Sequence, residues 1–245
     1  MSEPGTLARG IILPATGNPC VIIMVFCALL SLPSINIGDA AGIKTSYSLI
    51  KIFDTLIDSF ISNKIGIADN FLSEALALHL KENLYGLYSR KLLLSAGTGN
   101  ETLVLHNKLV RSDRIYWLDR RHNDIHENAF FDLVDSFVAY LNSTCYTGIT
   151  GYEFHYTMYE EGSFYKKHLD QFKNNSSRQY SMIVYLNEDW QKADGGELCI
   201  HHAGKLQTIS PANGKSVFFK SNELEHEVLV TTRERLSITG WLKIN

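Results

Sequence analysis

Apolar residues recur at helical spacing in three segments of the first half of the chain. The segments are residues 46–64, 72–93 and 126–144, and each predicts an amphipathic helix. In the second segment, Ser73 stands directly ahead of Glu74 and is expected to cap the helix. Residues 96–108 begin with glycine and polar residues, which predicts a loop.

The pattern changes after Gly148 to short runs rich in Val, Ile, Tyr and Phe, separated by Gly, Asn and Pro, which predict strands. The runs are residues 150–160, 178–187, 196–202, 215–220, 226–232 and 235–244, and a further short strand is expected within 110–119. Helices followed by strands predict an α+β protein, or helices packed on the outside of a β-sandwich. No repeat or linker interrupts this order. We therefore expect a single domain at 41–245, with helical support over 45–144 and a strand-rich core over 148–245.

The first 40 residues read as an N-terminal tail with an apolar stretch at Cys20–Leu32. This stretch is shorter than the roughly 20 residues that span a bilayer, so no stable membrane span is predicted. Two interpretations stay open. One is a signal peptide, with Arg9 upstream of the apolar stretch; the other is a spurious extension added by an upstream start codon.

Composition narrows the function classes. The chain is 45% hydrophobic and 20% charged, with a formal net charge of -3, so nucleic acid is not expected as a main partner. The cysteines are scattered and include no Cys-x-x-Cys pair, which argues against a disulfide scaffold and a thiolate zinc site. A cytoplasmic location is expected, although the apolar N-terminal stretch leaves secretion or membrane association open.

The segment Phe164–Phe172 sets His168 and Asp170 two residues apart. In a strand, both side chains would lie on one face, with Leu169 packing on the other. Alone, such a pair is most often an ordinary surface pair. One more imidazole from a distant strand would complete two histidines and one carboxylate. That set leaves coordination positions open and is characteristic of non-haem iron(II) oxygenases, whereas a structural zinc site is closed by four protein ligands.

An arginine on the last predicted strand could serve a co-substrate. The guanidinium group is a rigid fork that suits the far carboxylate of a dicarboxylate such as 2-oxoglutarate. Alternation places Arg235, Ser237, Thr239 and Trp241 on one polar and aromatic face, as expected for a pocket wall. Arg233 shares this face and is a rival for the role, but it lies nearer the strand start, where solvent reaches it more easily.

Taken in order, the segments H-L-D, YLN-x-D-W, GGEL, HEV and R-x-S-I-T-G-W resemble the 2-oxoglutarate/Fe(II)-dependent dioxygenases. The similarity is closest to the prolyl 4-hydroxylase branch, with its oxygen-sensing prolyl hydroxylases and bacterial relatives. It extends over about residues 68–245 and is most specific over 152–244. The resemblance implies a double-stranded β-helix (jelly-roll) core with the N-terminal helices packed outside.

The resemblance also implies roles for individual residues. The expected iron ligands are His168, Asp170 and His226, and the expected partners of the 2-oxoglutarate distal carboxylate are Arg235, through a salt bridge, and Tyr185, through a hydrogen bond. Tyr159 resembles a pocket tyrosine near the metal, although it lies one residue closer to the H-L-D segment than in the family pattern. Trp241 resembles an aromatic residue lining the site. His155, in an alternating strand, is expected to be a packed or exposed histidine rather than a ligand.

The activity that the resemblance implies is hydroxylation of a C–H bond, with peptidyl-proline in a protein converted to 4-hydroxyproline. The cofactor and co-substrates would be Fe(II), 2-oxoglutarate and O2, the by-products succinate and CO2, and the reductant L-ascorbate. Two alternatives stay open. The same chemistry could act on a free amino acid or small metabolite, or the chain could be a non-catalytic metal-binding jelly roll that serves as an interaction module.

Overall fold

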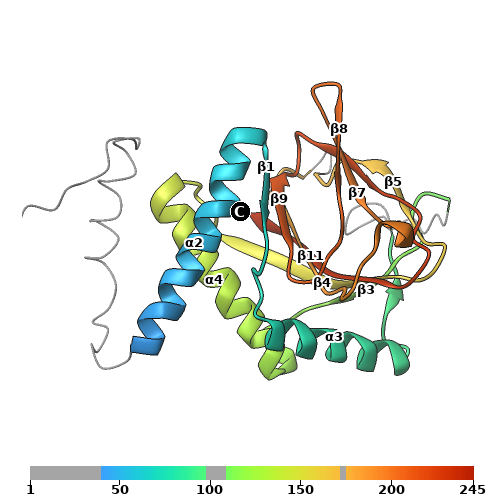
Figure 1. The fold of residues 1–245 in the computed structure, drawn as a ribbon, viewed down its shortest axis with the longest axis horizontal. Coiled ribbons are helices and arrows are strands. Elements are labelled where there is room, and N and C mark those ends of the chain that lie inside the picture. Colours follow the sequence, from blue (N-terminus) through green and yellow to red (C-terminus); the bar gives the residue numbers. More distant parts are fainter. Residues whose placement is uncertain (1–39, 98–108, 172–174) are drawn as a thin grey trace, which may run out of the picture. The chain divides into compact units, whose positions relative to one another are not determined.

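The predicted helices are all present. The computed structural model describes residues 40–97, 109–171 and 175–245, so the expected N-terminal tail and most of the predicted loop lie outside the described residues. Residues 41–245 form one compact unit, and its helices are α2 (Ala40–Asn63), α3 (Glu74–Ser89) and α4 (Ile125–Cys145) (Figure 1). Short 3-10 helices, η1 (Arg120–His122) and η2 (Lys192–Asp194), complete the helical elements of the described part. None of these helices is long and apolar enough to cross a membrane.

The start of α3 follows the sequence signal. Ser73 has an extended backbone, and its Oγ atom accepts a hydrogen bond from the Leu76 N–H at 3.2 Å. This bond satisfies one of the backbone donors that have no partner within the first turn of a helix. The predicted cap is confirmed.

Replacing Ser73 by alanine is expected to lower the free energy of unfolding by about 1 kcal/mol, because the capping bond is lost while the helix remains. Urea denaturation followed by circular dichroism measures the change. Ser89→Ala is the matched control, since this exposed serine bonds to the Gly86 carbonyl near the other end of the same helix. An equal loss in the two variants would contradict the capping role.

Two antiparallel sheets form the rest of the domain. The major sheet has the order β1-β9-β6-β11-β4-β3-β2 and the minor sheet the order β5-β10-β7-β8 (Figure 1). The major strands are β1 (Ile65–Ala68), β2 (Leu94–Ser95), β3 (Arg114–Trp117), β4 (Gly151–Tyr159), β6 (Arg178–Tyr185), β9 (Ser216–Lys220) and β11 (Arg235–Lys243). The minor strands are β5 (Tyr165–His168), β7 (Leu198–His202), β8 (Lys205–Ile209) and β10 (Glu225–Val228). This architecture confirms the predicted α+β jelly roll.

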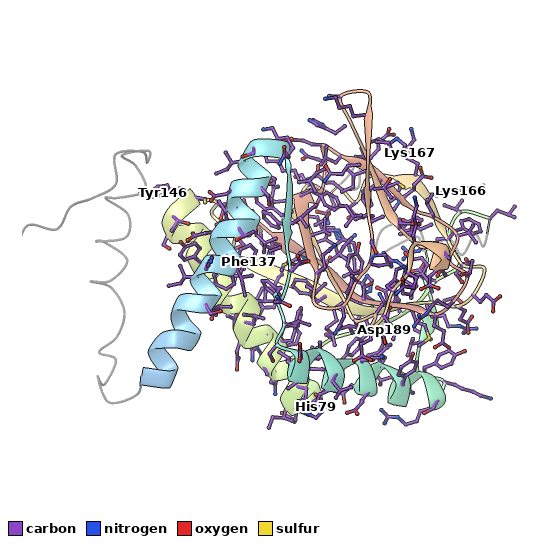
Figure 2. All side chains as sticks on the ribbon, viewed as in Figure 1. His79, Phe137, Tyr146, Lys166, Lys167 and Asp189 are labelled. Carbon is purple, nitrogen blue, oxygen red and sulfur yellow. The ribbon has the colours of Figure 1, made fainter. Side chains whose placement is uncertain are left out.

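Two cores hold the layers together. The larger core joins the helices to one face of the major sheet, and Phe137 of α4 lies in it (Figure 2) with ring centroids 5.0 Å from Phe53, 5.9 Å from Phe71 and 5.6 Å from Phe218. The smaller core lies between the two sheets and includes Tyr185. The helices therefore support the major sheet from outside and leave its other face to the minor sheet and to the cavity described next.

Candidate active site

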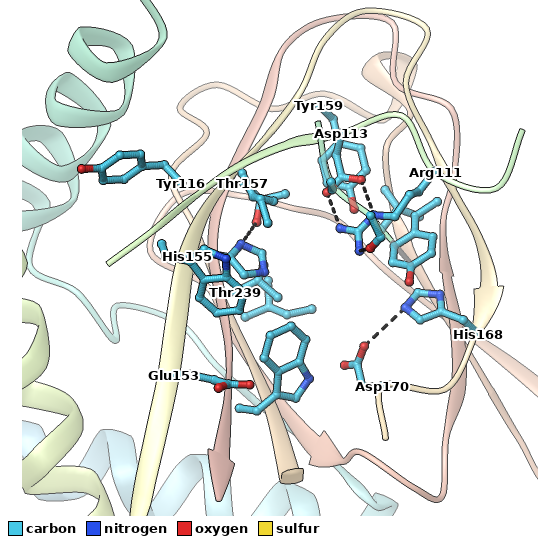
Figure 3. Close-up of a pocket in the computed structure, with 18 of the residues that line it drawn as sticks. Arg111, Asp113, Tyr116, Glu153, His155, Thr157, Tyr159, His168, Asp170 and Thr239 are labelled. Atoms are coloured by element: carbon cyan, nitrogen blue, oxygen red, sulfur yellow. Dashed lines mark hydrogen bonds and ion pairs between the residues drawn. The ribbon is translucent and has the colours of Figure 1, made fainter. Parts of the chain in front are cut away.

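A cavity of about 1710 Å³ opens between the two sheets (Figure 3). On the major-sheet side, β11 contributes Arg235, Thr239 and Trp241 to the lining. The intervening residues Leu236 and Ile238 belong to the core beneath the helices. Strand alternation thus separates packing residues from pocket residues, as predicted.

Ser237 departs from the predicted pocket wall. It is fully buried, and its Oγ atom lies 3.3 Å from Thr239 Oγ1, within hydrogen-bonding distance. The cavity lining on this strand does not include it. Alternation places a side chain on a face of the sheet, but whether the side chain reaches a cavity depends on what packs above it.

The minor sheet brings three candidate metal-binding side chains together. His168 on β5 and His226 on β10 are cross-strand partners. Asp170 lies beside them, and one possible ligand atom from each of the three side chains lies within 4.8 Å of the others. Among the described residues, this is the one group of histidine, cysteine and carboxylate side chains with such spacing.

The local structure around Asp170 differs from the prediction in two ways. Strand β5 ends at His168, so Asp170 lies in a bend beyond the strand rather than on its face. Leu169 is 43% exposed and lines the cavity instead of packing behind the strand. The bend, rather than strand alternation, therefore turns the carboxylate toward the two histidines.

The backbone orients both imidazoles. His168 Nδ1 lies 2.7 Å from the Lys166 carbonyl oxygen, and His226 Nδ1 lies 3.1 Å from that of Leu224. A carbonyl oxygen can only accept, so each Nδ1 carries the proton and each Nε2 presents a lone pair. The Nε2 atoms lie 3.4 Å (His168) and 3.6 Å (His226) from Asp170 oxygens. Burial lowers the pKa of His226 to about 4, so this imidazole is neutral, as metal coordination requires.

Two buried serines stand behind the carboxylate. Ser181 Oγ donates to Asp170 Oδ2 at 2.6 Å, and Ser221 Oγ lies 2.9 Å from Ser181 Oγ. Both serines are fully buried. Burial opposes ionisation of Asp170, but His226, His168 and the Ser181 hydroxyl outweigh it and hold the pKa of the carboxyl far below its ordinary value. Asp170 is therefore a fixed anion that faces the Nε2 atoms of the two histidines.

Replacing Ser181 by alanine is expected to weaken metal binding by about 10- to 100-fold, because hydrogen-bond partners of a ligand set its orientation. Isothermal titration with Co(II) or Zn(II) measures the change. Ser216→Ala is the matched control: Ser216 is equally buried in the same sheet, but its Oγ donates to the Ala68 carbonyl. Parallel losses of metal affinity in both variants would show a general effect of cavity creation.

Arg235 is a buried cation at the wall of the same cavity. It is 1% exposed, and its Nε donates to the Gly196 carbonyl at 2.7 Å. Within the described residues, no carboxylate lies within ion-pair distance of it. Gly196 has φ +65°, and a Cβ there would come within 3.1 Å of the Arg235 side chain, so this position favours glycine. The rival Arg233 is exposed and pairs with Asp194 at 3.4 Å.

Three aromatic residues complete the predicted site. The Arg235 guanidinium carbon lies 4.9 Å from the Tyr159 ring centroid and 5.0 Å from that of Tyr185. The Tyr185 hydroxyl is buried without a hydrogen-bond partner in the described part of the chain. Burial raises the pKa of both tyrosines, so each keeps its proton as a donor at neutral pH. Trp241 lines the cavity, with the Arg178 guanidinium carbon 3.5 Å from its ring centroid.

The sequence analysis missed a stack that reaches the first histidine. Arg111 binds Asp113 through two hydrogen bonds, of 2.8 and 2.6 Å, and its guanidinium carbon lies 4.2 Å from the Tyr165 ring centroid. The Tyr165 ring stacks on His168 at 3.5 Å. Alternation would place Tyr165 and His168 on opposite faces, but an irregular register in the pairing of β5 with β10 brings the rings together. No spacing rule in the sequence indicates this contact.

The fold and the cluster together define the class. A jelly roll that presents two histidines and one carboxylate on one side of a cavity has the arrangement characteristic of non-haem iron(II) oxygenases. Residues 154–243 match the family model of the 2OG-Fe(II) oxygenase superfamily. With the relatives described next, this match supports a prolyl hydroxylase-like 2-oxoglutarate/Fe(II) oxygenase.

Two curated relatives share part of the chain. A hypoxia-inducible factor prolyl hydroxylase of Caenorhabditis elegans is 32% identical over 193 residues, which cover 71% of this chain and 26% of the relative. A PKHD-type hydroxylase of Acaryochloris marina is 31% identical over 91 residues, which cover 36% of this chain and 40% of the relative. Because the chain spans less than half of either relative, their substrates do not carry over by similarity alone.

Solved structures agree on the fold. A Pseudomonas putida prolyl-4-hydroxylase superposes with a TM-score of 0.71 at 29% identity, covering 79% of this chain and 99% of that one. A Trichoplax adhaerens prolyl hydroxylase, solved in complex with a hypoxia inducible factor peptide fragment, gives a TM-score of 0.74 at 21% identity and covers 84% of this chain and 94% of that one. The jelly-roll architecture is shared with both.

Proposed function

We propose that the chain hydroxylates a prolyl residue in a protein or peptide substrate and couples this reaction to the conversion of 2-oxoglutarate to succinate and CO2. One observation carries the co-substrate assignment. Arg235 is a buried guanidinium with no carboxylate partner among the described residues, and it lines the same cavity as the histidine–carboxylate cluster. A buried unpaired charge is costly, so a bound anion is the natural partner.

Each residue of the site has a separate proposed role. His168, Asp170 and His226 would hold Fe(II), with their orientation set by backbone carbonyls and by Ser181. Fe(II) held there would supply, with 2-oxoglutarate and O2, the oxidative chemistry of the reaction. Arg235 forms a bidentate pair with the distal carboxylate of the co-substrate.

The tyrosines and the cavity wall complete the assignment. Tyr185 donates a second hydrogen bond to the same carboxylate, which satisfies its otherwise unpartnered hydroxyl. Tyr159 packs against the arginine, and Tyr159 and Trp241 both line the cavity in which the substrate would lie. The proposed binding partner is thus a peptide in the same cavity that would hold the metal and the co-substrate.

The cavity supports a peptide rather than a small metabolite. Small-molecule pockets usually measure about 300–1,000 Å³, whereas this cavity measures about 1710 Å³. Its lining includes apolar side chains that are strongly exposed: Leu94 at 71%, Trp117 at 45% and Leu169 at 43%. Exposed apolar groups around an opening are typical of surfaces that bind a chain. A cytoplasmic setting is part of the proposal and agrees with Cys145 and Cys199, which are free thiols.

Succinate release under 18O2 tests the function. The chain is incubated with Fe(II), ascorbate, 2-oxoglutarate and a library of proline-containing peptides, and products are read by mass spectrometry. One labelled oxygen atom is expected in the peptide and one in succinate. Turnover of free amino acids but of no peptide would favour the metabolite alternative. Metal binding without succinate release under any condition would favour the non-catalytic interaction module.

A further inference from the structure

His155 on β4 is a buried polar residue in the cavity wall to which the proposed reaction assigns no role. It is 3% exposed and lies among the residues that line the cavity. In Figure 3 it stands with Thr239 across the pocket from His168 and Asp170. An imidazole in a cavity wall can bind a ligand only through a ring nitrogen that no protein group occupies, so the hydrogen bonds of His155 decide what it can do.

One ring nitrogen is occupied and the other is free. Nδ1 lies 3.1 Å from the Tyr156 carbonyl oxygen and 2.9 Å from Thr157 Oγ1. The carbonyl oxygen can only accept, so the proton resides on Nδ1 and Nε2 carries a lone pair. Nε2 has no hydrogen-bond partner in the described part of the chain. His155 therefore offers the cavity a hydrogen-bond acceptor.

The surroundings favour an uncharged partner. The His155 ring centroid lies 5.0 Å from that of Trp117 and 5.6 Å from that of Trp241, so the imidazole is flanked by two indoles. Burial, assisted by the Arg111 charge, lowers the pKa of His155 to about 4, so the ring is neutral at pH 7. A neutral acceptor in an aromatic niche does not attract a carboxylate, but it suits an amide N–H or a hydroxyl.

We propose that His155 determines substrate specificity: its Nε2 accepts a hydrogen bond from one N–H or O–H group of the peptide, held between Trp117 and Trp241. This inference rests on the proposed function, because it names a contact to the substrate of that same site. It gives His155 no part in holding the metal or the co-substrate.

The test removes donors from the substrate and the acceptor from the protein. A peptide that the chain hydroxylates is resynthesised with each backbone amide near the proline N-methylated in turn, and with each side-chain donor replaced by alanine. For the wild type, one of these changes is expected to lower kcat/KM by about tenfold, the effect of one buried hydrogen bond. His155→Phe keeps a ring but lacks the acceptor. In this variant the same change to the peptide is expected to lower kcat/KM by less than about twofold.

Further readouts separate recognition from damage to the site. His155→Gln restores an acceptor, so the modified peptide is again expected to lower kcat/KM, although by less than in the wild type. The Co(II) affinity and the KM for 2-oxoglutarate are expected to stay at wild-type values in both variants. Nitrogen-15 NMR of the free protein should show the proton on Nδ1. An equal penalty in wild type and His155→Phe, or a proton on Nε2, overturns the inference and leaves the proposed function intact. If the wild type hydroxylates none of the peptides, both the inference about His155 and the proposed function are overturned.

Discussion

Replacing Asp170 by alanine is expected to abolish both metal binding and turnover. The carboxylate is the only anion in the cluster, and its pKa lies far below the ordinary value, so the wild type presents a negative charge to a cation throughout the neutral range. Loss of a mere hydrogen-bond partner of a ligand costs about 10- to 100-fold in metal affinity, so loss of the ligand itself is expected to exceed about a hundredfold. Titration with Co(II) measures the affinity, and succinate release measures turnover.

Two companion variants separate charge from shape. Asp170→Asn keeps the size of the side chain and an oxygen that can accept from Ser181, yet it is neutral and is expected to bind metal almost as poorly as the alanine variant. Asp69→Ala removes a carboxylate that is 72% exposed and only weakly paired with Lys215, and it should leave affinity unchanged. Strong metal binding by Asp170→Asn would show that the charge of this residue is not what holds the cation.

The sequence allowed the chemistry of the site to be predicted better than its backbone. His168, Asp170 and His226 were expected to meet, and they do, yet the strand argument for the first two is wrong because β5 ends before Asp170. The residue types and their order carried the prediction, since few combinations of side chains can complete such a site. Their roles as ligands stay a prediction until metal binding is measured.

What the sequence could not indicate depends on three-dimensional neighbours. Ser181 is one of several strand serines, and only the fold places its hydroxyl beside Asp170. Tyr165 reaches His168 through an irregular strand pairing that no periodicity encodes. Strands β1, β2 and β8 also escaped prediction: β1 and β2 are very short, and the mostly exposed, polar β8 has no clear apolar face.

The choice between Arg233 and Arg235 shows the same limit. Both residues lie on one predicted face, and the sequence favours Arg235 only through the position of Arg233 nearer the strand start and through the spacing of the family it resembles. In the structure Arg233 is exposed and paired with Asp194, whereas Arg235 is buried against Tyr159 and Tyr185. Burial without a counter-charge is what marks a binding residue here, and burial is a property of the fold.

Replacing Arg235 by methionine is expected to weaken co-substrate binding and, at the same time, to stabilise the ligand-free protein. Charged hydrogen bonds contribute about 1.5–3 kcal/mol, so the KM for 2-oxoglutarate should rise by about 10- to 150-fold, while Co(II) affinity is retained. In the absence of ligand the guanidinium is buried without a carboxylate partner among the described residues. The desolvation cost of such a charge is several kcal/mol, which exceeds the value of its one bond to the Gly196 carbonyl.

Thermal unfolding with and without 2-oxoglutarate tests both parts of this prediction. The ligand-free variant is expected to unfold a few degrees above the wild type, since 1 kcal/mol corresponds to about 2–4 °C for a domain of this size. The co-substrate should raise the Tm of the wild type by mass action but not that of the variant. Arg233→Met is the control, because its exposed side chain pairs with Asp194 and should affect neither quantity. A lower Tm for ligand-free Arg235→Met would mean that the guanidinium supports the fold, and an unchanged KM would remove the co-substrate from this end of the cavity.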